Sequence, residues 1–124
     1  MFGHKAALAI AGTSWNATGI SDGKGAVVAL IAGSKPTLKF GSDGSLSGSA
    51  GCNSYTGRYE ISDTRVKFPN AFASTRKMCV TPGVMDQEQA FLKALSASTT
   101  GRIEGRKLEL RDATGTLQVT ASAP

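Results

Sequence analysis

Hydrophobic and polar residues alternate along three stretches of the chain, and each stretch contains a tight turn. The stretches are residues 37–49, 59–68 and 107–120, and their turns are Gly41-Ser42-Asp43-Gly44, Ser62-Asp63-Thr64 and Asp112-Ala113-Thr114-Gly115. Alternation with a period of two is typical of strands with one buried face. Short turns rich in glycine and aspartate connect such strands. The sequence therefore predicts three β-hairpins.

Only one stretch, residues 84–98, has the period of an α-helix. Most of its apolar residues fall on one face, and Asp86 and Glu88 lie in its first turns, where the helix dipole favours acids. The run Ala26–Ala32 is instead short and continuously apolar, which favours a buried strand. A single amphipathic helix must bury its apolar face, and hairpins must cover their edges. We therefore expect a mainly β domain with one α-helix, in which an antiparallel barrel-like sheet is closed or plugged by this helix.

The length and composition of the chain are those of one folded domain. It has 124 residues, 40% hydrophobic and 19% charged, which excludes a disordered chain. The apolar run Ala6–Ala11 is too short for a transmembrane segment, which needs about 20 residues, and it makes a poor signal peptide. We expect residues 1–12 to form a flexible N-terminal segment, or to mark the point where a longer chain was cut, and residues 13–124 to form the domain.

The net charge of +5 comes from lysines and arginines that are scattered along the chain. Most of them fall at outward-facing strand positions or in turns. A nucleic-acid platform needs basic residues on one face together with aromatic residues for stacking. We therefore expect solvated faces and no specific nucleic-acid partner, with attraction to anionic surfaces as the open alternative.

Groups that enzymes use for catalysis are sparse in this sequence. The only histidine is His4, and the chain contains no nucleophile-elbow or phosphate-loop motif. Four aspartates lie in turn-like sequence, where such side chains hydrogen-bond their own backbone; they are Asp22, Asp43, Asp63 and Asp112. We expect no enzymatic activity, no catalytic residue and no cofactor.

Cys52 and Cys79 are the only cysteines. Two thiols and a distant histidine cannot form a four-ligand zinc site, so we expect no metal. A disulfide is the favoured interpretation and would stabilise the fold by about 3 kcal/mol. Two buried free thiols are the alternative. A disulfide implies an oxidising compartment.

Three motifs follow one another in a specific order. Gly51-Cys52-Asn53 comes first, Thr75-Arg76 with Cys79 comes second, and Met85-Asp86-Gln87-Glu88 opens the helix. This order resembles the META domain, or HslJ-like, family, and the resemblance extends over nearly the whole chain. It implies an antiparallel barrel-like domain with one helix, found in bacterial envelope or secreted proteins that are often lipid-anchored and associated with stress responses, without an established molecular activity.

Arg76 and Glu88 carry opposite charges in the second and third motifs. We expect a structural ion pair between them that fixes the loop to the helix. A site for an anion or a peptide is the alternative. Asn53, beside Cys52 and bracketed by glycines, is expected to be a turn residue.

Together these observations predict a non-enzymatic, monomeric domain that binds an unknown protein or small molecule or contributes to stress tolerance. The resemblance implies a location in the periplasm, at the outer membrane or outside the cell, although this chain has no signal or anchor. Two alternatives stay open. One is a carrier of small hydrophobic ligands that uses the barrel interior. The other is a protease-inhibitor-like module that presents a disulfide-braced loop near Cys52 or Cys79.

Overall fold

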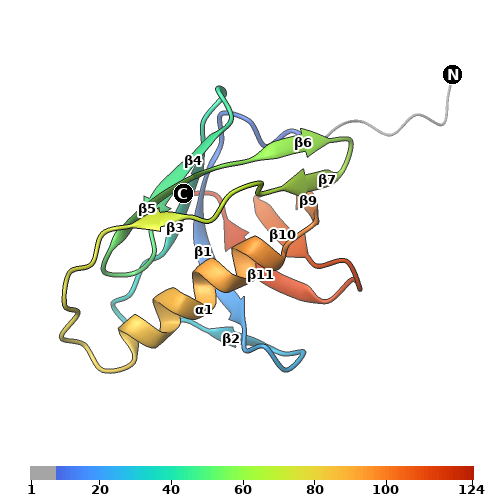
Figure 1. Ribbon diagram of the computed structural model, residues 1–124. Coiled ribbons are helices and arrows are strands. Elements are labelled where there is room, and N and C mark those ends of the chain that lie inside the picture. The colour runs from blue at the N-terminus through green and yellow to red at the C-terminus, as the bar shows by residue number, and fades with distance from the viewer. Residues whose placement is uncertain (1–7) are drawn as a thin grey trace, which may run out of the picture.

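The computed structural model describes residues 8–124, which form one antiparallel sheet and one helix (Figure 1). The elements are β1 (Ser14–Ser21), β2 (Val27–Ala29), β3 (Thr37–Phe40), β4 (Ser45–Ser49), β5 (Ser54–Arg58), β6 (Glu60–Ser62), β7 (Arg65–Lys67), β8 (Ala73–Ser74), α1 (Val84–Ala97), β9 (Thr100–Glu104), β10 (Lys107–Arg111) and β11 (Leu117–Ser122). Hydrogen-bonded strands follow the order β6-β7-β9-β10-β11-β1-β3-β4-β5-β8, and β2 pairs with β1. The sheet curls into a half-barrel, which confirms the predicted fold class.

The three predicted hairpins are present as β3–β4, β6–β7 and β10–β11. In the first, Gly44 has a φ of 85°, a left-handed conformation that glycine adopts without strain. The side chain of Asp43 accepts hydrogen bonds from the hydroxyl and backbone N–H of Ser45, and these lower the pKa of Asp43. Asp112 accepts equivalent hydrogen bonds in the third hairpin, from the hydroxyl and backbone N–H of Thr114. These aspartates therefore stabilise turns, as the sequence predicted.

One stretch of chain contributes a strand to both ends of the sheet. β5 lies beside the edge strand β8, whereas β6 is the edge strand at the opposite end. Only Tyr59 separates the two strands; its ring packs edge-on against Phe40 at 5.1 Å, and its hydroxyl donates to the carbonyl of Gly41. The chain itself therefore links the two ends of the half-barrel.

The helix packs against β1 and β11 and buries its apolar face (Figure 1). Phe91 and Leu95 are fully buried, and the ring of Phe91 meets the buried ring of Tyr55 at 5.6 Å. Leu92 is only half-buried and Met85 is 46% exposed, so both lie at the margin of the predicted face. No helix within residues 8–124 has the length and hydrophobicity needed to cross a membrane.

The interior of the half-barrel is filled with side chains. Those that are fully buried include Ile10, Leu38, Phe40, Leu46, Tyr55, Phe91, Leu95, Leu108, Leu110 and Val119. They occupy the space that a ligand inside the barrel would need. The structure therefore lends no support to a carrier that uses its interior.

The run Ala26–Ala32 does not form the predicted buried strand. Only Val27–Ala29 is a strand, it pairs with β1 alone, and Val28 is 48% exposed. The apolar run satisfies the pattern of a buried strand, but no second layer covers β2. Burial here depends on tertiary packing that the local pattern does not contain.

The packed part of the chain begins before residue 13, where the sequence placed the start of the domain. Ile10 is fully buried, and the backbone N–H of Leu8 donates to the carbonyl of Asp63 at 2.7 Å. Ile10 therefore belongs to the core, and Leu8 packs against it. Residues 1–7 lie outside the part of the chain that the structure describes.

Two leucines on α1 test this description of the core. Leu95→Ala empties a fully buried position and should lower the free energy of unfolding by about 2–5 kcal/mol. Leu92→Ala, on the half-buried side of the same helix, is the matched control and should cost clearly less. Urea denaturation of the two variants measures both values. Equal losses would show that the helix packs through a different face.

Candidate functional site

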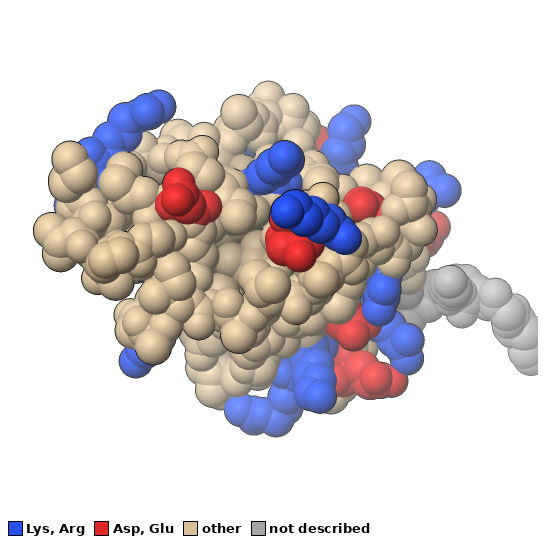
Figure 2. Space-filling view, turned by 90° about the horizontal axis from the view of Figure 1, so that it is seen from below, with Lys and Arg blue, Asp and Glu red and all other residues tan. Residues whose placement is uncertain are grey.

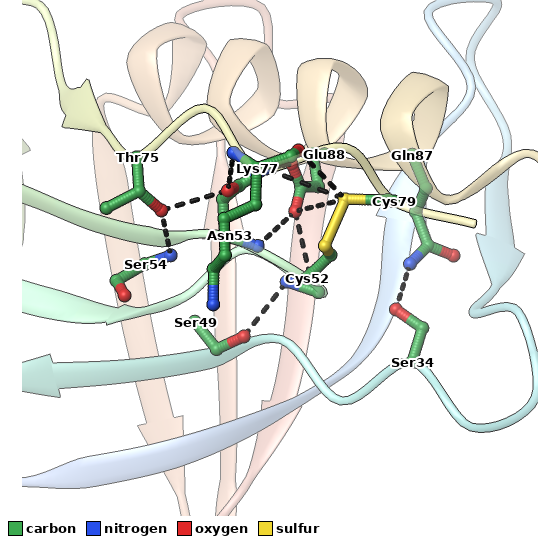
Figure 3. Close-up of a disulfide and its surroundings, with 11 residues drawn as sticks. Ser34, Ser49, Cys52, Asn53, Ser54, Thr75, Lys77, Cys79, Gln87 and Glu88 are labelled. Atoms are coloured by element: carbon green, nitrogen blue, oxygen red, sulfur yellow. Dashed lines mark hydrogen bonds between the residues drawn. A yellow bond between two sulfur atoms is a disulfide. The ribbon is translucent and has the colours of Figure 1, made fainter. Parts of the chain in front are cut away.

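Three segments meet at the N-terminal end of α1 (Figure 3), and the first of them is far from the other two in the sequence. They are the turn between β4 and β5, the segment 75–83 between β8 and α1, and the first turns of α1 itself. A disulfide between Cys52 and Cys79 joins the first two segments, with 6.1 Å between the Cα atoms. The predicted pairing of the cysteines is confirmed.

The carboxylate of Glu88 lies beneath this disulfide and is enclosed by N–H groups. Glu88 is only 6% exposed. One oxygen accepts the backbone N–H groups of Cys52 and Asn53 at 2.7 and 2.5 Å, and the other accepts the side-chain amide of Asn53 at 2.9 Å. Burial by itself raises the pKa of Glu88, but the three hydrogen bonds outweigh it and leave the pKa below its ordinary value. The helix therefore holds the turn through an ionised, buried carboxylate.

The side chain of Asn53 connects this carboxylate to the segment 75–83. Asn53 is 3% exposed, and its oxygen accepts the hydroxyl of Thr75 at 2.9 Å and the backbone N–H of Lys77 at 2.7 Å. Its amide donates to Glu88 and, at 3.3 Å, to the carbonyl of Lys77. Asn53 is thus more than the turn residue that the sequence predicted, because it holds both backbone groups of Lys77.

Gly51 makes this arrangement possible. Its φ is 132°, which side-chain-bearing residues rarely adopt, and a Cβ added there would lie 3.0 Å from the hydroxyl of Ser34. Its backbone N–H donates to the hydroxyl of Ser49. The glycine therefore lets the next two N–H groups reach the oxygen of Glu88, and this explains the first residue of the Gly51-Cys52-Asn53 motif.

The neighbouring residue on α1 fixes another loop. The side-chain oxygen of Gln87 accepts the backbone N–H of Ile31 at 2.7 Å, and its amide donates to the hydroxyl of Ser34 (Figure 3). Sequence reasoning missed this contact, since a glutamine early in a helix gives no signal of its partner.

Arg76 does not pair with Glu88, so the predicted ion pair is wrong. Arg76 is exposed, and the ion pairs found within residues 8–124 are Arg102–Glu104 and Arg111–Glu109. The physical reason is that backbone and amide N–H groups already satisfy both oxygens of Glu88. Of the second motif, Thr75 and Cys79 contribute to the site, whereas Arg76 makes no hydrogen bond or ion pair within the described residues.

After Lys77, the segment 75–83 exposes two apolar side chains to solvent. Met78 is 80% exposed and Val80 is 91% exposed, although the disulfide fixes Cys79 between them. Within the described chain, the backbone groups of Arg76, Met78 and Val80 make no hydrogen bond. A hollow of about 250 Å³, lined by Gly33, Ser34, Met78 and Val80 among others, lies beside the disulfide. Among the described residues, Met78 and Val80 are the most exposed of the large hydrophobic side chains.

The ligand atoms of Cys52, Cys79 and Glu88 lie within 4.8 Å of one another, a spacing that a metal ion could bridge. Metal binding by cysteine requires thiolates. The two sulfurs are bonded to each other, and the carboxylate is occupied by N–H groups. In the disulfide form the cluster therefore offers a metal no suitable ligand set.

Comparison with known proteins places these features in context. The model of the META domain family matches residues 7–124. An NMR structure of a protein from Burkholderia xenovorans is similar, with a TM-score of 0.76 and 25% identity over 100% of this chain and 93% of that one. A crystal structure of a DUF4847 family protein from Bacteroides vulgatus shares the fold, with a TM-score of 0.61 and 15% identity over 92% and 94% of the two chains. No curated protein matches the chain.

The lowered pKa of Glu88 makes stability depend on pH. In the unfolded chain this carboxyl titrates near its ordinary value of 4.5, and in the folded domain it titrates lower. The stability that the ionised carboxylate contributes is therefore fully present above the unfolded pKa. It is lost as the pH falls through the lower, folded pKa. We expect Glu88→Gln to cost about 2–4 kcal/mol at neutral pH, and the difference from wild type to shrink on acidification.

Urea denaturation between neutral pH and about pH 3 measures this difference. Asp86→Asn removes an exposed carboxylate from the same turn of α1 and is the control, for which we expect little change. A cost of Glu88→Gln that is the same at every pH would contradict the buried, ionised carboxylate.

A reciprocal exchange tests the contact between Asn53 and Glu88. Asn53→Asp places two carboxylates against each other, and Glu88→Gln places two amide NH₂ groups against each other, so each should cost about 2–4 kcal/mol. The combined variant restores one donor facing one acceptor and leaves the acceptor for Thr75 and Lys77 unchanged. We expect the double variant to be more stable than the sum of the single costs predicts, by at least about 1 kcal/mol. Additive costs in thermal denaturation would rule out the contact.

Proposed function

Because this chain belongs to the META domain family, for which the resemblance implies no established activity, we propose its function from the site: a non-enzymatic, extracytoplasmic domain that binds a protein partner through residues 76–80. The observation that supports this proposal is the exposure of Met78 and Val80 on a segment fixed at Lys77 and Cys79. Exposed apolar side chains on a fixed loop mark interaction sites. Fixing the loop beforehand also reduces the entropy lost on binding.

The polar cluster supports a structural rather than a catalytic role for Glu88. A general base must reach a proton on a substrate. Both oxygens of Glu88 already accept N–H groups, and no buried polar side-chain atom of the described residues lacks a hydrogen-bond partner. In this proposal the cluster holds residues 76–80 in place, and these residues contact the partner.

The disulfide supports an extracytoplasmic location, in the periplasm, at the outer membrane or outside the cell. Disulfides persist in oxidising compartments and are rare in the cytosol. Cys52 and Cys79 join segments that also meet through Asn53, so the bond forms part of the site rather than an isolated contact.

The distribution of charge favours a protein partner over nucleic acid. Figure 2 shows lysine and arginine side chains interspersed with aspartate and glutamate, not gathered into one patch, on the face that it presents. Nucleic-acid binding needs a continuous basic surface. We propose a monomer that meets its partner through the apolar loop.

Site-specific photocrosslinking tests this function. A diazirine amino acid at position 78 should give one adduct of defined mass in cells that make the protein, and the same group at the exposed position 28 should not. Excess wild-type protein should compete the adduct away, whereas the Met78→Asp/Val80→Asp variant should compete roughly 10-fold less well or worse. An adduct that both proteins compete equally, or no adduct at position 78, would reject binding through this loop.

A further inference from the structure

The domain fixes two residues of the segment 76–80, each in a different way. Lys77 is held through its backbone N–H and carbonyl by Asn53, and Cys79 is held through its sulfur by Cys52. The backbone groups of Arg76, Met78 and Val80 make no hydrogen bond within the described chain. Met78 therefore lies between two fixed neighbours, while its own side chain and backbone groups face no partner within the described residues.

A partner for this face must do two things at once. It must cover Met78 and Val80, which are 80% and 91% exposed, and it must pair the free backbone groups beside them. A lipid bilayer can cover apolar side chains, but its hydrocarbon cannot pair backbone N–H and carbonyl groups. A protein cleft that binds an extended chain does both.

We propose that residues 76–80 bind, in the manner of a substrate, in the active-site cleft of a serine protease, with the side chain of Met78 in its specificity pocket. This inference rests on the proposed function and names the class of its partner. Serine proteases bind extended chains through backbone hydrogen bonds and select one side chain in a pocket. Met78 is the residue that presents both a free backbone and an exposed side chain between two anchors.

The two anchors make the segment an inhibitor rather than a substrate. The peptide bond between Met78 and Cys79 lies between the hydrogen bonds to Lys77 and the disulfide at Cys79. If the protease serine attacks, its oxygen bonds to the carbonyl carbon of Met78, the bond to the nitrogen of Cys79 breaks, and the serine proton passes through the histidine to that amine. The disulfide keeps the amine in place, so it attacks the acyl carbon again, releases the serine and restores the peptide.

The chemistry of the side chain selects the kind of pocket. Methionine is unbranched, flexible and apolar, which suits the hydrophobic pocket of a chymotrypsin-like or subtilisin-like protease. The acidic pocket of trypsin instead selects lysine and arginine. The neighbouring Arg76 and Lys77 are both exposed and add positive charge beside the pocket-filling residue.

Inhibition assays with chymotrypsin, subtilisin and trypsin test the proposal with the oxidised, full chain. We expect inhibition of chymotrypsin or subtilisin, and a loss of roughly 100-fold or more for Met78→Asp. Met78→Lys should shift the preference toward trypsin by roughly 100-fold, a change that a purely structural role does not produce. Val28→Asp alters an exposed apolar side chain elsewhere and should leave inhibition unchanged.

The anchors have a separate readout. Replacing both cysteines by alanine should turn the inhibitor into a substrate that is cleaved after Met78, as mass spectrometry would record. Wild-type protein that inhibits none of the three enzymes, or that is cleaved rapidly after Met78, would overturn the proposal. Binding to phosphatidylglycerol vesicles that Met78→Asp abolishes, without protease inhibition, would replace the protease with a membrane. In either case a competed crosslink at position 78 would leave the proposed function standing.

Discussion

A single buried carboxylate organises the junction from which residues 76–80 extend. Glu88 is on the helix, yet its oxygens accept N–H groups from the turn before β5. A buried charge without partners costs several kcal/mol. If the turn moved away from the helix, the carboxylate of Glu88 would lose its hydrogen-bond donors. The position of the helix therefore fixes the position of Asn53, and Asn53 in turn fixes the backbone of Lys77.

The disulfide and the hydrogen bonds fix the same junction by different means. The disulfide closes a loop with a sequence separation of 27, which lowers the entropy of the unfolded chain and corresponds to about 3–4 kcal/mol. The hydrogen bonds of Asn53 act in the folded state, where they set the direction of the backbone at Lys77. The disulfide limits how far the segment can move from the turn, and the hydrogen bonds of Asn53 determine the conformation of its backbone. Both are needed for a segment with few hydrogen bonds of its own to hold one shape.

Sequence patterns predicted the parts of the fold that depend on residues close together in the sequence. The three hairpins and the helix follow from periodicity and turn residues, and the disulfide from the two motifs that contain its cysteines. The partner of Glu88 was predicted wrongly, because charge complementarity points to Arg76, whereas the actual donors are N–H groups whose direction depends on the φ of Gly51. The exposure of β2 and of Met78 could not be predicted from the sequence either, since an apolar residue carries no sign of whether another layer covers it.

The central position of β1 shapes how the chain reaches its native state. β1 contains residues 14–21, and one of its neighbours in the sheet is β11, which ends at Ser122, two residues before the end of the chain. The middle of the sheet thus joins the first and the last strand of the described residues. Contacts of such long sequence separation slow folding, because the pairing of β1 with β11 requires the closure of a loop that spans nearly the whole domain. Until β11 has been synthesised, the edge of β1 that pairs with it stays unpaired and exposes backbone N–H and carbonyl groups with which another chain can pair.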